Sequence, residues 1–124
     1  RVLVLLSDGI DERSHSTVRD VMELARRAAV TLYTVGLEDT EPYSPIIDRP
    51  LLTRLAEETG GRCFIVEGTS SLQSVYREIE QDVRSRYLLA YYSSHAGDER
   101  SFRLVDVKLA GQRLAARTIR GYYP

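Results

Sequence analysis

The residue triplet Ser7-Asp8-Gly9 is the part of this sequence best suited to chemistry. It follows an apolar run, Val2 to Leu6, whose valines and leucines predict a strand buried on both faces of a parallel sheet. Gly9 permits a sharp backbone turn, so the Asp8 carboxylate is expected at the carboxyl end of the strand, where open α/β sheets bind ligands. Asp8 can cap the turn there, or it can meet a ligand in that crevice.

Further acidic and histidine side chains are predicted at the same edge or in polar loops. We expect the acidic ones to form a solvated rim and both histidines to lie at the surface. Ser14 and Ser16 flank His15, but no acid is placed to orient that histidine, so a hydrolytic triad is not expected. The rim residues are Asp11, Glu12, Glu38, Asp39 and Glu41, and the histidines are His15 and His95.

Length and composition limit the possible classes of protein. At 124 residues and 14.1 kDa the chain is long enough for one domain with its own core and too short for two. The net charge of -1 provides no basic surface for nucleic acid, and no apolar run is long enough to span a membrane. A single cysteine, Cys63, excludes an internal disulfide and is predicted to be a small core residue. Because the chain enters a core strand at once, with no leader, we expect a piece of a longer protein.

Hydrophobic periodicity predicts three strands that alternate with three helices over residues 1–86. Apolar residues at three- and four-residue spacing mark the helices, and the pair Gly60-Gly61 ends the second one. With right-handed crossovers, this order predicts an α/β fold: a three-layer, Rossmann-like parallel sheet with helices on both faces. The predicted strands are 2–6, 30–35 and 62–66; the predicted helices are 17–29, one capped by Asp48, and one from Ser70 or Ser71 to Ser85.

The last third, residues 87–124, predicts an antiparallel β extension packed on the α/β part. Tyr87 to Tyr92 and Phe102 to Leu109 are rich in the apolar and aromatic residues of strands, and Gly111 marks a turn before a third candidate strand, Leu114 to Ile119. The tyrosines of this region are expected to contact cross-strand neighbours rather than to stack on bases.

Five short stretches follow one another along almost the whole chain: Val-Leu-Val-Leu-Leu-Ser-Asp-Gly-Ile-Asp at 2–11, Leu-Tyr-Thr-Val-Gly-Leu at 32–37, Leu-Ala-Glu-Glu-Thr-Gly-Gly-Arg at 55–62, Ser-Arg-Tyr-Leu-Leu-Ala-Tyr-Tyr at 85–92, and Arg-Gly-Tyr-Tyr-Pro at 120–124. As an ordered set they resemble the von Willebrand factor type A family, in its bacterial VWFA-related group. The resemblance implies that the chain is the C-terminal half of such a domain with a C-terminal β extension, so that strand 2–6 is the fourth of six. It also implies a location outside the cytoplasm.

The resemblance also implies a metal site. In that family three loops hold a divalent cation, usually magnesium; they carry Asp-x-Ser-x-Ser, a threonine, and an aspartate in Ser/Thr-Asp-Gly. Only the last pattern occurs here, so Asp8 is the one implied ligand, for Mg²⁺ or for Mn²⁺ or Ca²⁺ in its place. The stretch from Asp11 to Ser16 has the wrong spacing for the first loop. Since magnesium takes about six oxygen ligands, this chain alone is expected to bind metal poorly. The implied function is a non-catalytic, metal-ion-assisted module that binds an acidic side chain of a protein partner.

Two other classes remain open for Asp8. A phosphatase of the haloacid dehalogenase type uses a strand-end aspartate as its nucleophile. That class requires a second aspartate two residues later, where this chain has Ile10. The remaining class is a structural scaffold with a degenerate site. We therefore expect a binding module and not an enzyme.

Overall fold

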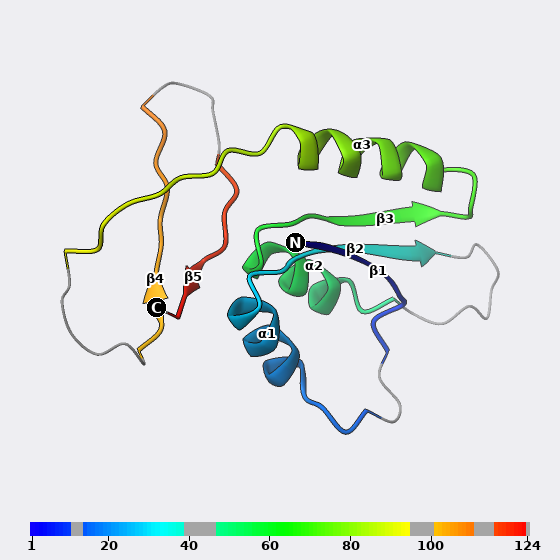
Figure 1. Ribbon diagram of the computed structural model, residues 1–124. Coiled ribbons are helices and arrows are strands. Elements are labelled where there is room, and N and C mark those ends of the chain that lie inside the picture. Colours follow the sequence, from blue (N-terminus) through cyan, green and yellow to red (C-terminus); the bar gives the residue numbers. More distant parts are fainter. Residues whose placement is uncertain (11–13, 39–46, 95–100, 111–115, 124) are drawn as a thin grey trace.

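The structure is a computed structural model, and it describes residues 1–10, 14–38, 47–94, 101–110 and 116–123. It is a mixed α/β fold with a parallel sheet of three strands and a separate antiparallel sheet of two (Figure 1). Along the chain the elements are β1 (Val2–Leu6), α1 (Val18–Arg27), β2 (Thr31–Glu38), α2 (Arg49–Glu58), β3 (Cys63–Glu67), α3 (Leu72–Arg84), β4 (Arg103–Leu104) and β5 (Gly121–Tyr122). The alternating order predicted for residues 1–86 is confirmed.

Alternate residues of β2 face opposite sides of the parallel sheet, and each side has its own apolar cluster. In Figure 1, α3 lies above the sheet, whereas α1 and α2 lie below it. Tyr33 and Val35 pack with α3, and Leu32 packs with α1 and α2. The upper cluster is completed by Phe64, Val66, Val75 and Ile79, and the lower one by Met22, Ala25 and Leu55.

The first two helices begin at polar capping residues, Thr17, where the first helix was predicted to start, and Asp48, the predicted cap of the second. Thr17 and Asp20 form a capping box, in which Asp20 N donates to Thr17 Oγ1 (3.2 Å) and Thr17 N donates to Asp20 Oδ2 (2.8 Å). The hydrogen bonds from Thr17 lower the pKa of the Asp20 carboxyl. Asp48 caps α2 by accepting from Leu51 N (3.0 Å), and Pro50 lies in the first turn.

The turn after α2 joins that helix to β2 through a buried hydroxyl. Thr59 Oγ1 accepts from Leu32 N (2.9 Å) and donates to carbonyl oxygens at the end of α2. Beside it, Thr34 Oγ1 donates to Leu52 O (2.9 Å). Gly60, with φ of +80°, then turns the chain out of the helix, as its position predicted. Both buried hydroxyls are therefore paired, and they fix α2 against the centre of the sheet.

β1 occupies the predicted residues, but the prediction that both of its faces are buried is wrong. The exposed fractions of Val2, Leu3, Val4 and Leu6 are 39%, 49%, 37% and 48%. Among the described residues β1 has one sheet neighbour, β2, and the helix on the upper face packs on β2 and β3. A parallel strand is buried only where it has strands on both sides and helices above and below.

Some apolar residues at the three- and four-residue spacing that predicts the helices, and the predicted core residue Cys63, are partly or largely exposed. Val21 of α1 and Tyr76 and Val83 of α3 are exposed, and Cys63 is only partly buried. The third helix was also predicted to begin with a serine cap, but the Ser71 side chain makes no capping hydrogen bond.

β2 continues beyond its predicted end at residue 35, through Gly36 to Glu38. A Cβ atom on Gly36 would lie 2.8 Å from Ile65 Cδ1 and 3.2 Å from Leu52 Cδ1. The glycine therefore allows α2 and β3 side chains to approach the β2 backbone closely, within a strand that remains regular.

The predicted strands of the last third are mostly wrong. Residues 87–92 form no strand, and Phe102 to Leu109 contains only the two-residue β4. Residues 116–119, the described part of the third candidate, are irregular, and β5 follows them; Gly111 lies outside the described residues. β4 and β5 do pair antiparallel, with Arg103 opposite Tyr122. Apolar, aromatic sequence favours a strand, but a strand forms only where a neighbour supplies hydrogen bonds.

The backbone of β1 has one edge paired and one edge free within the described chain. Thr31 N donates to Arg1 O (3.0 Å) and Ser7 N donates to Val35 O (3.1 Å), so odd-numbered residues of β1 bond to β2. In a parallel ladder the residues between them direct their N–H and C=O groups to the other edge. These are Val2, Val4 and Leu6.

We expect the free edge of β1 to make the chain self-associate. Val4→Pro removes an N–H that faces the free edge, where proline is tolerated, so this variant should associate less and stay folded. Leu3→Pro removes an N–H that faces β2, and it should lower the free energy of unfolding by about 1–3 kcal/mol. Light scattering and urea unfolding followed by circular dichroism measure the two effects. A monodisperse wild-type monomer, or equal unfolding of the two variants, would contradict the assignment of this edge.

Candidate functional site

The Asp8 loop leaves the end of β1 in a tight, hydrogen-bonded turn. Gly9 has φ of +82°, a conformation that glycine adopts readily. Gly9 N donates to Ser7 Oγ (3.0 Å), and Ile10 N donates to Asp8 Oδ1 (3.0 Å). The half-buried Asp8 therefore lies at the carboxyl end of the parallel sheet, as predicted, and one of its oxygens holds the turn.

The same loop contacts the start of α2. Asp48 N donates to Asp8 O (2.8 Å), while the Asp48 side chain caps the helix. A Cβ atom on Gly9 would lie 3.1 Å from Asp48 Cβ and 3.4 Å from Leu52 Cγ, so the loop and the helix pack closely. The positions of Asp8 and of the α2 N-terminus are thus coupled.

The second oxygen of the Asp8 carboxylate makes no hydrogen bond with the described residues. Within the described part of the loop, residues 7–10, it is the one unpaired carboxylate oxygen available to a ligand. Nowhere in the described ranges do three His, Cys, Asp or Glu side chains gather closely enough to hold a metal ion. Asp8 therefore provides one oxygen ligand, whereas Mg²⁺ requires about six.

The other predicted site residues do not assemble around Asp8 in the described chain. Glu38, at the end of β2, pairs with Arg49: Arg49 Nε donates to Glu38 Oε1 at 3.1 Å. This pairing raises the pKa of the Arg49 guanidinium. His15 is exposed ahead of α1. Asp11, Glu12, Asp39, Glu41 and His95 lie outside the described residues.

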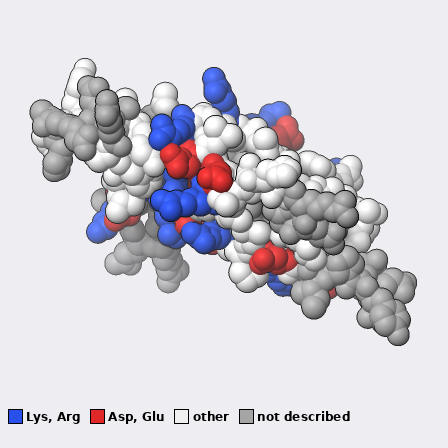
Figure 2. Space-filling model, turned by 90° about the horizontal axis from the view of Figure 1, so that it is seen from below, with Lys and Arg blue, Asp and Glu red and all other residues white. Residues whose placement is uncertain are grey.

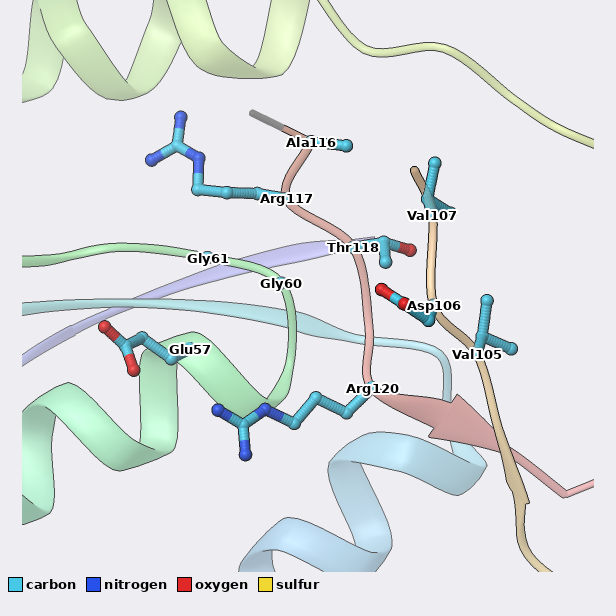
Figure 3. A pocket seen from close by; sticks show the side chains of 10 residues that line it. All are labelled: Glu57, Gly60, Gly61, Val105, Asp106, Val107, Ala116, Arg117, Thr118 and Arg120. Atoms are coloured by element: carbon cyan, nitrogen blue, oxygen red, sulfur yellow. The ribbon is translucent and has the colours of Figure 1, made fainter. Parts of the chain in front are cut away.

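A shallow hollow that the sequence did not predict lies beside the end of α2 (Figure 3). It has a volume of about 290 Å³, and its walls come from the turn after α2, from residues 105–107 and from residues 116–120. Figure 3 shows the side chains of Glu57 and Arg120 on its α2 side and that of Asp106 across from them. No local motif marks it, because its walls are segments far apart in the sequence.

Ion pairs balance the charge around this region. On the lower face of the molecule, basic side chains gather with acidic ones directly beside them (Figure 2). Arg26 and Arg54 both pair with Glu58, and Arg117 Nη2 donates to Asp82 Oδ2 (2.8 Å). The hollow therefore lacks the strong single-sign field that would select a charged ligand.

Comparisons with known proteins add information on the fold alone. No protein-family profile and no curated protein matches the chain. Among solved structures it is similar to an uncharacterized membrane spanning protein from Vibrio fischeri, with a TM-score of 0.57 and 24% identity. The match covers 65% of this chain and 46% of that chain, so the chain spans less than half of that protein's length. In the described part of the present chain, the helices are too short or too polar to cross a bilayer.

Proposed function

We propose that this chain belongs to a Rossmann-like, von Willebrand factor type A domain that binds a protein partner with the help of a metal ion and catalyses no reaction. One observation carries the proposal: the Asp8 carboxylate lies at the carboxyl end of β1 with one oxygen bonded to Ile10 N and the other unpaired among the described residues. In parallel α/β sheets this end of the strands is where ligands bind.

The described residues do not themselves make a complete metal site. They supply Asp8 as a single ligand, and the edge of β1 next to it has free hydrogen-bonding groups. In the proposed domain, further strands pair with this edge and bring the other ligand loops beside Asp8. A divalent cation bound there would present an open coordination position to an acidic side chain of the partner protein.

The residues encoded before Arg1 test the proposal first, because they should contain Asp-x-Ser-x-Ser. The chain extended by those residues should bind Mn²⁺ saturably in a calorimetric titration, and the chain alone should bind it much more weakly. Asp8→Asn keeps the size of the side chain and removes its charge. It should weaken Mn²⁺ binding by at least about 10-fold. Replacing a residue that only hydrogen-bonds to a metal ligand already causes a loss of this size.

Asp106→Asn is the matched control, because Asp106 is an exposed aspartate outside the Asp8 loop and forms an ion pair with Lys108 (3.5 Å). It should leave the Mn²⁺ affinity unchanged. Equal binding by the Asp8→Asn variant and the unmodified protein would refute the role of Asp8. Release of phosphate from a phosphoester that Asp8→Asn abolishes would instead identify a phosphatase.

A further inference from the structure

Residues 87–92, Tyr-Leu-Leu-Ala-Tyr-Tyr, form an uncharged apolar segment that faces water. The exposed fractions of Tyr87, Leu88, Leu89, Tyr91 and Tyr92 are 92%, 97%, 68%, 62% and 104%. In Figure 1 this segment leaves α3 and runs away from the parallel sheet. Single exposed apolar side chains are ordinary, but a contiguous run of this kind marks an interaction surface.

The segment is tied down on both sides. Before it, Arg86 donates to Thr31 Oγ1 (3.0 Å) and to Tyr33 Oη (3.1 Å). At its other end, the Tyr91 hydroxyl donates to Tyr122 Oη (3.1 Å), which raises the pKa of Tyr91 and lowers that of Tyr122. Just beyond, Arg103 Nη1 donates to Ser93 Oγ (2.9 Å). A segment anchored in this way loses less conformational entropy when a partner binds it.

Exposure is not uniform along the segment. Leu89 and Tyr91 are less exposed than Tyr87, Leu88 and Tyr92, and Tyr91 contacts Tyr122 of β5. Tyr87, Leu88 and Tyr92 are almost fully exposed. The segment thus has the composition of a strand but forms no strand pairing among the described residues.

A second copy of the same segment fits it as a partner. In antiparallel pairing about a two-fold axis, one residue must lie opposite itself. With Ala90 on the axis, Leu88 lies opposite Tyr92 of the second copy and Leu89 lies opposite Tyr91. Both of these pairs join leucine to tyrosine, Tyr87 lies opposite Ser93, no like charges meet, and the smallest side chain of the segment occupies the crowded centre.

The area available is close to what a stable contact needs. The three tyrosines can each bury up to about 150–250 Å², and with the two leucines the upper limit for the segment approaches the roughly 800 Å² per partner of a standard interface. We propose that residues 87–92 are a self-recognition strand, through which two copies of the chain pair antiparallel with Ala90 on the two-fold axis. This contact is independent of Asp8 and of any metal.

Sedimentation of the full chain in the Val4→Pro background isolates this contact, because that substitution blocks the free edge of β1. If the Val4→Pro variant loses its folded circular dichroism spectrum, Val4→Lys serves as the background in its place, because it adds a charge to the same edge. We expect a dimer in this background. Adding Leu88→Lys and Tyr92→Lys places lysine opposite lysine twice across the axis, and it should weaken dimerisation by at least about 100-fold.

Two matched variants distinguish the proposed contact from general stickiness. Leu88→Lys with Tyr92→Glu removes the same apolar groups but places opposite charges across the axis, so it should dimerise at least about 10-fold more tightly than the double lysine variant. Leu24→Lys with Tyr76→Lys adds the same charge on exposed positions of α1 and α3 and should leave the dimer intact. A monomer in the Val4→Pro background would overturn the proposal, and so would equal affinities of the Lys/Lys and Lys/Glu variants.

Discussion

Gly61→Ala should lower the free energy of unfolding by more than about 4 kcal/mol, an exceptional loss for one methyl group. Gly61 directly follows the turn after α2, and a Cβ atom there would lie 1.8 Å from Leu32 O and 2.8 Å from Leu32 C. Those are backbone atoms of β2, the strand between β1 and β3, so they cannot move without disturbing both pairings. The free energy of unfolding of a domain of this size is about 5–15 kcal/mol, so this substitution should remove a large part of it.

Gly68→Ala is the control for this substitution. Gly68 has φ of +66°, and no atom lies within 4 Å of the position that a Cβ would take, so alanine there meets only the backbone penalty. That penalty is about 1–2 kcal/mol. Urea unfolding followed by circular dichroism compares the two variants. If Gly61→Ala unfolds at the same urea concentration as Gly68→Ala, the close approach of Gly61 to β2 is incorrect.

Leu52→Ala should cost about 2–5 kcal/mol, the range for a leucine deleted from a packed core. Leu52 is 1% exposed, and its side chain lies beneath both Gly36 of β2 and the Gly9 turn. Its carbonyl oxygen also accepts the buried Thr34 hydroxyl. Shortening this side chain therefore opens a cavity under the Asp8 loop as well as in the core.

Leu24→Ala makes the same chemical change in α1, at a residue that is 69% exposed. It should shift the free energy of unfolding by no more than about 0.5 kcal/mol. Thermal or urea unfolding of the two variants gives the difference directly. Similar losses for Leu24→Ala and Leu52→Ala would mean that α2 does not pack on the sheet as described.

The elements of residues 1–86 could be predicted because their signals are local. Thr17 with Asp20, and Asp48 with Pro50, satisfy the first N–H groups of a helix within a few residues of sequence. The apolar runs between those helices leave little choice but strands of a parallel sheet. The position of Asp8 at the sheet rim follows from the same pattern, whereas its role as a metal ligand stays a prediction.

Burial and pairing in the rest of the chain depend on neighbours that no local pattern encodes. Val2 to Leu6 has the pattern of a buried strand, yet its exposure depends on what lies at its second edge. Tyr87 to Tyr92 has the pattern of a strand, yet it pairs with no strand in the part of the chain that the structure describes. The hollow near Arg120 combines segments separated by about half of the chain, so no spacing rule could reveal it.

Where no further strand covers the free edge of β1, that edge and the segment 87–92 have a joint consequence for assembly. A single two-fold contact closes on itself and stops at two copies. Two different self-pairing surfaces on one chain close only where their two-fold axes intersect at a suitable angle, as in a tetramer of D2 symmetry. With any other arrangement of the axes, every dimer formed through one surface carries two unused copies of the other, and association proceeds as an open linear polymer whose length rises with protein concentration. A small amount of a variant with one of the two surfaces blocked would bind the ends of the polymer, stop its growth and so determine its length.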